Sequence, residues 1–349
     1  MQHEQPSKMF SIALLTALAV TSSPAWPLTQ LVAGMDLDGG SIHVVDPATG
    51  GLTLEPFGAA FMGGVRVAAG DLTGDGTADL IVGTGPGSTA SARVIDGISQ
   101  QVIGNLIEPY GANFLGGVFV AVGDVNADGI VDIIAAPSDD AEPTVKVFDG
   151  ATGAEIFSFL AYDAAFRGGV RVAAGDVNGD GHADIITGPG SAGTTHVKVF
   201  SGRDTTELAQ LIPFSTQFMG GVFVGAGDFD GDGDDDLVVA SGADPVAGAG
   251  GGPHVKVFNG TDLQVLADFR PYDTMFTGGV RVALGDIDGD GLADIITAPG
   301  DDGPPLLTGW LSPDVSNNDD MLVFNPAYRG GLFVAASVVT PTLLRDSFE

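Results

Sequence analysis

Short apolar runs separated by glycine-rich and acidic turns recur along almost the whole chain. The pattern is most regular over Phe166–Gly190, FRGGVRVAAGDVNGDGHADIITGPG, where an acidic turn has an apolar run on either side. Four further copies and a partial sixth begin at aromatic residues, namely Phe61, Phe114, Phe218, Phe276 and Tyr328. Successive copies lie 53, 52, 52, 58 and 52 residues apart. A fixed period of this size predicts a repeat architecture.

Each repeat predicts four β-strands. In the third repeat, apolar runs rich in β-branched residues cover about Gly169–Gly175, Ala183–Gly188, His196–Ser201 and Glu207–Phe214. The third-to-fourth connections carry hairpin dipeptides such as Asp149-Gly150. Four strands in one such repeat are the content of a propeller blade.

The two ends of the chain supply the parts of one more repeat. Leu28–Gly34, Ser41–Asp46 and Leu52–Phe57 match the second half of a repeat, and Leu332–Ser337 matches its first strand. We therefore expect an all-β, six-bladed β-propeller of four-stranded antiparallel blades, closed by a composite blade from both termini. Closure removes the unpaired edges of an open sheet. The predicted blades span about residues 64–113, 117–165, 169–217, 221–275, 279–327, and 331–338 joined to 28–60.

The fifth repeat is the most divergent. Leu306–Leu311 takes the third-strand place and Asp320–Phe324 the fourth, which leaves Ser312–Asp320 as a long acidic loop. The fourth repeat carries about six extra residues in Val246–Pro253, and the fifth also carries Asp301–Pro305. Loops on a rigid scaffold often carry binding sites. Tolerated surface insertions are the alternative for each loop alone.

The acidic turn has the residue pattern of a calcium loop. In the third repeat, oxygen side chains stand at positions 1, 3, 5 and 9, from Asp176 to Asp184, with Gly181 at position 6. Calcium takes about six to eight oxygen ligands, and the glycine permits the sharp turn that lets position 7 offer its carbonyl. An EF-hand would place a glutamate at position 12, where this repeat has Thr187 in a predicted strand. The pattern therefore indicates a different calcium loop.

The predicted ligands occupy positions 1, 3, 5, 7 and 9 of all five loops, with position 7 contributing its backbone carbonyl. They are Asp71, Thr73, Asp75, Thr77 and Asp79; Asp124, Asn126, Asp128, Ile130 and Asp132; Asp176, Asn178, Asp180, His182 and Asp184; Asp228, Asp230, Asp232, Asp234 and Asp236; and Asp286, Asp288, Asp290, Leu292 and Asp294.

Charge count predicts the order of calcium affinity. The first loop, with the neutral Thr73, should bind most weakly, and the fourth and fifth loops most tightly. Metal-free turns are the alternative, because Asp and Asn favour turns. However, three or four carboxylates within nine residues repel one another, and turn formation would not select the same positions five times. We therefore expect about five Ca²⁺ ions.

The pattern D-x-[DN]-x-D-G-x-x-D, following a G-G-V-x-V-A-x-G strand, resembles the FG-GAP repeat family, also described as VCBS repeats. Its best-known members are the propeller domains of integrin α chains. The resemblance covers about residues 28–338. One copy is a weak signal, but five copies in phase are a specific one. The resemblance implies a calcium-loaded propeller.

The first 25 residues predict a secretory signal peptide. Lys8 precedes the apolar run Met9–Val20, and Ser23 and Ala25 suit a cleavage site. The run is too short for a membrane span, and no later apolar stretch reaches about 18 residues. An apolar, unstructured N-terminus is the alternative. We expect a secreted or cell-surface protein, or a periplasmic one. Residues 340–349 are either a sorting tag or a frayed end.

The formal net charge of −32 disfavours nucleic acid or anionic lipid as partners, since both require a basic surface. Most basic residues are repeat positions. Arg66, Arg171 and Arg281 alternate along the repeats with Phe119, Phe223 and Phe333 in the first strand, and Arg93, Lys146, Lys198, Lys256 and His43 share a third-strand place. We expect the first group to form cation–π contacts with three-fold alternation around the ring. The alternative is an arginine ring that captures an anionic ligand.

Catalytic residues are scarce. The chain has no cysteine, which excludes thiol chemistry and disulfides, and its five histidines are His3, His43, His182, His196 and His254. No nucleophile–base pair, zinc cluster or phosphate-binding loop is visible. We therefore expect a monomeric, non-catalytic binding or adhesion module for protein or glycan ligands. The alternatives are a calcium-dependent, polysaccharide-active lyase, in which Lys or Arg removes a proton from a uronic acid, and a ligand-free surface scaffold.

Overall fold

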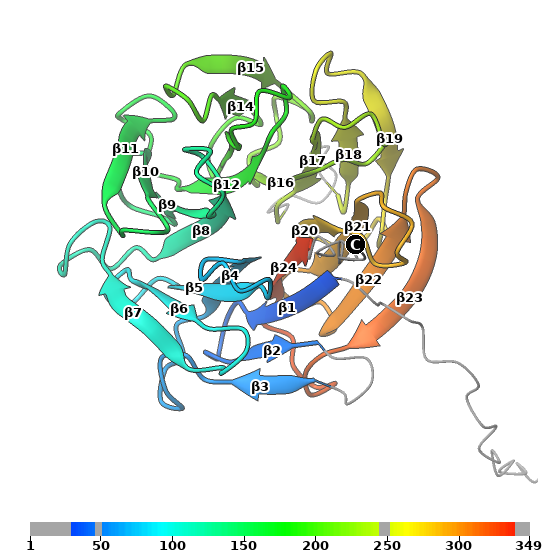
Figure 1. Cartoon of the computed structure of the whole chain (residues 1–349). Coiled ribbons are helices and arrows are strands. Elements are labelled where there is room, and N and C mark those ends of the chain that lie inside the picture. The colour runs from blue at the N-terminus through cyan, green and yellow to red at the C-terminus, as the bar shows by residue number, and fades with distance from the viewer. Residues whose placement is uncertain (1–28, 46–50, 244–251, 339–349) are drawn as a thin grey trace, which may run out of the picture.

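The computed structural model describes residues 29–45, 51–243 and 252–338 of the chain. These residues form six four-stranded antiparallel sheets arranged as a ring around a central axis (Figure 1). No helix is present in these three segments, so nothing in them could cross a membrane as a helix. The predicted six-bladed β-propeller is confirmed.

Each blade runs from an innermost strand at the axis to an outermost strand at the rim. Blade 1 contains β4 (Val65–Gly70), β5 (Asp79–Thr84), β6 (Ala92–Ile95) and β7 (Val102–Ile107); blade 2 contains β8 (Val118–Gly123), β9 (Asp132–Pro137), β10 (Thr144–Phe148) and β11 (Glu155–Leu160); blade 3 contains β12 (Val170–Gly175), β13 (Asp184–Pro189), β14 (Val197–Phe200) and β15 (Glu207–Leu211); blade 4 contains β16 (Val222–Gly227), β17 (Asp236–Ser241), β18 (Val255–Phe258) and β19 (Val265–Phe269); and blade 5 contains β20 (Val280–Gly285), β21 (Asp294–Pro299), β22 (Leu306–Leu311) and β23 (Ser316–Leu322).

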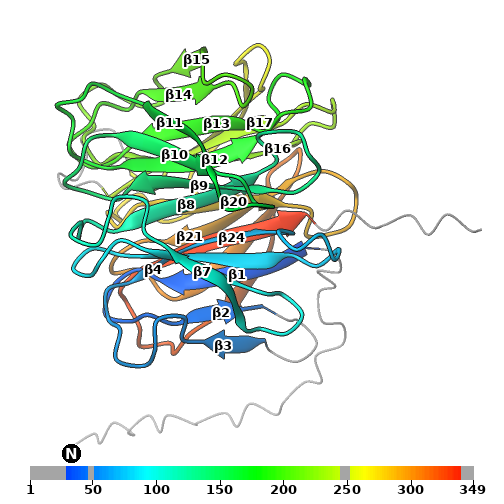
Figure 2. The ribbon, with the colours of Figure 1, turned by 60° about the vertical axis from the view of Figure 1, so that its left-hand side comes forward.

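The composite blade closes the ring as the sequence predicted. Its innermost strand is β24 (Leu332–Val338), which pairs over its whole length with β1 (Thr29–Met35). The strands β2 (Ile42–Val44) and β3 (Leu52–Leu54) complete the sheet. Figure 2 shows β1, β2 and β3 following one another outward from β24.

Burial is greatest in the second strand of each full blade and least in the outermost strand, which explains the apolar pattern. All six residues are buried in each of β5, β9, β13, β17 and β21, which have a neighbouring blade on both faces. The outermost strands are largely exposed. Glycines bring adjacent blades close together, because a Cβ at Gly83 or Gly188 would lie 2.5 or 2.4 Å from the carbonyl oxygen of the next blade's first strand residue. The repeated small residues are therefore required by blade packing.

Aromatic pairs four residues apart connect each blade to the next. Their ring centroids lie between 5.2 Å, for Phe57–Phe61, and 6.1 Å, for Phe214–Phe218 and Phe324–Tyr328. In two of the pairs the first ring is a tyrosine that also donates to the next blade. The Tyr162 hydroxyl, for example, lies 3.0 Å from Thr187 O and 2.9 Å from His196 O. The aromatic residue that marks the repeat therefore belongs to an inter-blade contact.

The fourth strand of blade 5 differs from the prediction. It spans Ser316–Leu322 rather than Asp320–Phe324, because Leu311 pairs directly with Ser316 and Trp310 with Asn317. The expected long loop Ser312–Asp320 is therefore mostly strand, with a short turn before it. In blade 3 the strand limits differ from the expected ones by up to three residues. The signal peptide, most of Val246–Pro253 and the tail after residue 339 lie outside the described residues.

Candidate metal centres and the arginine ring

The five acidic loops lie at one end of the innermost strands, where each first strand turns into the second. Three backbone hydrogen bonds join successive loops, and in each the residue at position 8 donates to the carbonyl of the preceding loop's first aspartate. Ala183 donates to Asp124 O at 2.8 Å, Asp235 to Asp176 O at 2.9 Å, and Ala293 to Asp228 O at 2.8 Å. These four loops therefore form a continuous band on one face of the ring.

The carboxylates at positions 1 and 5 shape each loop. In the fourth loop, Asp228 Oδ1 accepts the Gly231 N–H at 2.7 Å and Asp228 Oδ2 accepts the Gly233 N–H at 3.2 Å. Asp232 Oδ1 accepts the N–H of Asp234 at 3.0 Å. Gly231 and Gly233 have φ values of 79° and 96°, in the left-handed region that glycine tolerates. The sequence pattern identified the glycine at position 6 but missed the same requirement at position 4.

The aspartate at position 9 is fully buried in all five loops. Asp236 Oδ2 accepts the N–H groups of Phe229 at 3.0 Å and Asp230 at 3.2 Å, while its Oδ1 accepts that of Gly260 at 3.1 Å. It therefore ties its loop to the hairpin turn between the third and fourth strands. The spacing of the loop predicts this residue only as a ligand and does not reveal its role as an anchor.

Burial raises the pKa of the position-9 carboxylates, although the backbone N–H groups that they accept oppose the rise. The pKa reaches about 6 for Asp184, Asp236 and Asp294, and is also raised for Asp79 and Asp132. Nearby carboxylates contribute in the same direction, for example Asp230 beside Asp236. Each loop therefore holds negative charge that its surroundings do not fully compensate.

Two loops bring three carboxylates together. Oxygens of Asp228, Asp230 and Asp232 lie within 4.8 Å of one another, and so do oxygens of Asp286, Asp288 and Asp294. Within the described segments these are the two such groups, and they belong to the loops with the most carboxylates. The first three loops have threonine or asparagine at position 3 and form no group of this kind in the part of the chain that is described.

The donor chemistry of the loops suits calcium. The side chains at positions 1, 3, 5 and 9 are oxygen donors throughout, which is the ligand type that a hard cation prefers. In the second loop, Asn126 Nδ2 donates to Asp132 Oδ1 at 3.3 Å and to Asp149 Oδ2 at 3.1 Å, whereas Asn126 Oδ1 is buried without a hydrogen-bond partner. A cation in the loop would satisfy this oxygen. The residues present therefore fit Ca²⁺, and the individual ligands remain predictions.

The third loop carries a partial counter-charge of its own. Arg203 Nη1 lies 3.8 Å from Asp180 Oδ2 at an exposed position. The imidazole Nδ1 of His182 lies 2.8 Å from Val125 O in the second loop. The His182 side chain therefore connects two loops, while only its carbonyl was predicted to face a cation.

The opposite end of the innermost strands carries the alternating arginines and phenylalanines. Arg66 lies over Phe119 at 5.3 Å and Phe333 at 4.8 Å from guanidinium carbon to ring centroid. Arg171 lies over Phe119 at 5.9 Å and Phe223 at 4.1 Å, and Arg281 over Phe223 at 4.8 Å and Phe333 at 5.5 Å. The expected cation–π alternation is confirmed, and we call these six residues the arginine ring.

One carboxylate, which the repeat pattern does not reveal, lies in the arginine ring. Asp36 Oδ2 lies 2.6 Å from Arg281 Nη2, and Asp36 Oδ1 lies 3.7 Å from Arg66 Nη2. Arg171 forms no ion pair within the described residues, and its Nη1 donates to Pro189 O at 2.8 Å. Burial, together with the charge of Arg281, lowers the pKa of Arg171 to about 9 while Asp36 raises it, so the guanidinium stays charged at pH 7.

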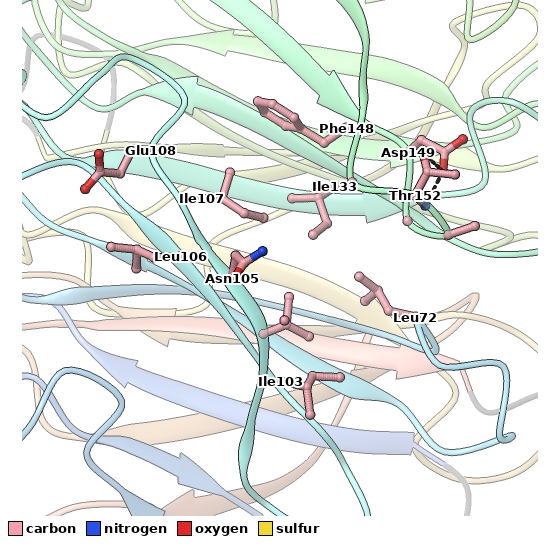
Figure 3. A pocket seen from close by; sticks show the side chains of 15 residues that line it. Leu72, Ile103, Asn105, Leu106, Ile107, Glu108, Ile133, Phe148, Asp149 and Thr152 are labelled. Carbon is pink, nitrogen blue, oxygen red and sulfur yellow. Dashed lines mark hydrogen bonds between the residues drawn. The ribbon is translucent and has the colours of Figure 1, made fainter.

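Two cavities lie near these features. A groove of about 530 Å³ separates the rims of blades 1 and 2, where Leu72, Ile103, Ile107 and Ile133 surround it (Figure 3). A second cavity, of about 400 Å³, lies at the arginine ring and is lined by Arg171, Arg281 and Phe223 together with loop residues of blades 3 to 5.

The described histidines of the third-strand region take part in hairpin contacts. His254 Nε2 lies 2.5 Å from Asp268 Oδ1, and His196 Nε2 lies 2.6 Å from Gln210 Oε1. Lys146 and Lys198 pair at 2.7 Å with Glu155 and Glu207 on the adjoining outer strands. These histidines and lysines therefore stabilise the hairpins formed by the third and fourth strands.

Comparison with known proteins agrees with the repeat pattern. A family model described as FG-GAP-like repeat matches residues 124–187 and 228–297, and one described as FG-GAP repeat matches residues 63–95. Both ranges that the FG-GAP-like model matches run from the first residue of one acidic loop, through the next acidic loop, into the strand that follows it.

Two solved structures share the fold at low sequence identity, and a third matches with a lower TM-score. A chain of a nidogen/laminin complex is 11% identical, with a TM-score of 0.56, over 89% of this chain and 99% of its own. A protein of unknown function from Bacteroides caccae is 11% identical, with a TM-score of 0.54, over 88% and 98%. The rhamnogalacturonan lyase YesW is 14% identical, with a TM-score of 0.43, over 84% and 63%. Residues 63–95, 124–187 and 228–297 therefore match FG-GAP or FG-GAP-like repeats, and these residues lie on a six-bladed β-propeller.

Proposed function

We propose that the protein is a secreted, calcium-binding β-propeller that acts as a non-catalytic binding module for protein or glycan ligands. Calcium binding is supported by one observation: three carboxylates lie within 4.8 Å of one another in the fourth loop and again in the fifth. Like charges at this separation repel strongly unless a cation lies among them.

Calcium, when bound, would neutralise these carboxylates and fix the loop conformation. The contacts that each loop makes with other parts of the chain determine which regions a bound ion would stabilise. The position-9 aspartates anchor each loop to a hairpin of its own blade, and the position-8 N–H groups join three of the loops to the loop before. A cation in each loop would therefore stiffen one whole face of the ring, with the fourth and fifth loops binding most tightly and the first most weakly.

A stiffened face of loops suits recognition of a large ligand. Binding residues occur preferentially on loops that a rigid scaffold positions. The chain of the nidogen/laminin complex has the same fold and belongs to a complex of two proteins, which supports a protein partner as one ligand class. Secretion rests on the predicted signal peptide and agrees with an extracellular supply of calcium.

The proposal is tested by presenting the mature protein to arrays of extracellular proteins and glycans, with 2 mM calcium (about the extracellular range) and with EGTA. Specific retention only in calcium is expected. Asp230→Asn in the fourth loop should weaken that retention, whereas Asp262→Asn, on an exposed turn of the same blade, should not. Release of unsaturated products from acidic polysaccharides by the wild-type protein would overturn the non-catalytic assignment.

A further inference from the structure

Three residues occupy the same place in the three phenylalanine-bearing blades. The backbone N–H of Asp36 in the composite blade donates to the carbonyl of the second residue in that blade's Gly-Gly pair at 3.0 Å. Ser138 in blade 2 makes the same bond at 3.0 Å, and Gly242 in blade 4 makes it at 2.8 Å. Each of the three therefore lies between two neighbouring arginines of the arginine ring.

The three positions differ in the side chain that they present to the neighbouring arginines. Asp36 places a carboxylate between Arg281 and Arg66, at 2.6 and 3.7 Å. Ser138 offers a hydroxyl, 3.5 Å from Arg66 Nη2. Gly242 offers no side chain, and the cavity of about 400 Å³ lies next to it, lined by the adjacent Ala243 and by Arg171, Arg281 and Phe223.

The ring has a surplus of positive charge. It contains three guanidinium groups and one carboxylate, and Arg171 has no ion-pair partner in the described part of the chain. The Nε atoms of all three arginines are buried without a hydrogen-bond acceptor. A buried donor or cation without a partner is costly, so an anion that reaches these groups gains binding energy.

We infer that the cavity between Arg171 and Arg281 binds a small monocarboxylate, in the place that Asp36 fills in the composite blade. A guanidinium matches the geometry of a carboxylate. Phe223 and Met219 add apolar surface to the cavity wall, which suits a short apolar tail. This inference is independent of calcium in the loops at the other end of the strands.

The outer wall of the cavity restricts the ligand. Asp301 and Asp302 line it and are exposed. They repel any anion, so Arg171 and Arg281 must offset that repulsion for the first carboxylate, whereas a second negative charge finds no partner. The net charge of −32 also repels polyanions at longer range. The ligand is therefore a compact acid with one carboxylate rather than an acidic polymer.

Hexanoate is a suitable probe for calorimetric titration of the full mature protein, with acetate as the head group alone and hexan-1-ol as the uncharged analogue. Saturable binding of one hexanoate is expected, with weaker acetate binding and no hexan-1-ol binding. Arg171→Met should weaken hexanoate binding by at least roughly tenfold, because one of the two guanidinium partners is lost. Arg167→Met, which removes an exposed arginine outside the ring, should leave the affinity unchanged. Absence of saturable binding to the wild-type protein, or equal affinity in Arg171→Met, would overturn the inference.

Ser138→Asp gives an independent test that leaves all three arginines in place. Its carboxylate would lie beside Arg66 and Arg171 and compete with the ligand for Arg171, so hexanoate should bind more weakly to a protein that melts at a higher temperature. Gly242→Asp is unsuitable, because a Cβ there would lie 2.1 Å from Gly220 O. If Arg171→Met does not fold, an unchanged hexanoate affinity in Ser138→Asp overturns the inference.

Discussion

The two ends of the innermost strands carry opposite charges that are arranged in different ways. At one end, the arginine ring separates its three guanidinium groups by phenylalanine rings, and Asp36 pairs with two of them. At the other end, the fourth loop packs Asp228, Asp230 and Asp232 within 4.8 Å of one another, and none of the three pairs with a lysine or arginine in the described segments.

This difference shows two ways in which a repeat protein can compensate charged residues that recur in every blade. Duplication of a blade duplicates every charged residue, so like charges meet wherever the blades converge. The arginine ring was compensated by a change in one blade, since Asp36 occupies a place that is glycine in four of the other five. Every full blade carries an acidic loop, and among the described residues Arg203 beside Asp180 is the one lysine or arginine within 4 Å of a loop carboxylate. Calcium is therefore the expected partner of the loops.

The largest expected effect on stability is a difference between substitutions of two arginines in the arginine ring. Arg281→Met leaves the buried Asp36 carboxylate with Arg66 alone, at 3.7 Å, and should lower the free energy of unfolding by about 3–5 kcal/mol. Arg171→Met removes a guanidinium that has no carboxylate partner, and should change it by no more than about 1 kcal/mol. Urea denaturation of both variants measures the difference. Equal losses would show that Asp36 does not distinguish the two arginines.

The next largest effect on stability should distinguish an anchoring aspartate from a calcium-binding aspartate in the fourth loop. Asp236→Ala removes the acceptor of three N–H groups and should cost about 3 kcal/mol, with or without calcium. Asp230→Ala, at an exposed position of the same loop, should lower the melting temperature in calcium but not in EGTA, where it removes one of three carboxylates that repel one another. Thermal melts of both variants in both buffers check this. A calcium-dependent loss for Asp236→Ala alone would contradict the separation of anchor and ligand.

A smaller effect concerns Asp235, which is outside the predicted ligand set. Burial first, and then the charges of Asp176 and Asp228, raise its pKa to about 6. The folded state therefore holds this proton more tightly than the unfolded state, and the stability it contributes is lost as the pH rises through about 6. In EGTA at pH 7.5, Asp235→Asn should stabilise the protein by about 1–2 kcal/mol, because the neutral amide can still accept the Asp176 N–H. The gain should vanish at pH 4; a gain that is the same at both pH values would contradict this origin.

The period of the repeat was sufficient to predict the ring, the composite blade and the alternation of arginine and phenylalanine. These features depend on which residues recur in phase, and recurrence is visible in the chain itself. Asp36 was missed for the same reason. Asp36 follows a strand in the sequence GMDLDG, and the residue at its place in the other blades is mostly glycine. Its place is therefore revealed only by the backbone hydrogen bond that its N–H donates to the Gly-Gly pair, as in the other blades.

The acidic loops were predicted as sets of oxygen donors, but their internal order was not. The spacing does not distinguish Asp236, which is buried against backbone N–H groups, from Asp230, which is exposed. Nor does it show that asparagine or threonine at position 3 leaves the first three loops without a group of three carboxylates among the described residues. The fourth strand of blade 5 was misplaced because its residues are polar, and its pairing depends on the short turn after Leu311.

The most direct test of calcium in the loops is a thermal melt of the mature protein in calcium and in excess EGTA, together with metal analysis of the purified protein. Binding to the native state alone must raise its stability. About five Ca²⁺ per chain and a large fall in melting temperature in EGTA are expected, with the last ions to be removed coming from the fourth and fifth loops. No bound metal and identical melting temperatures in the two buffers would contradict calcium binding by the loops.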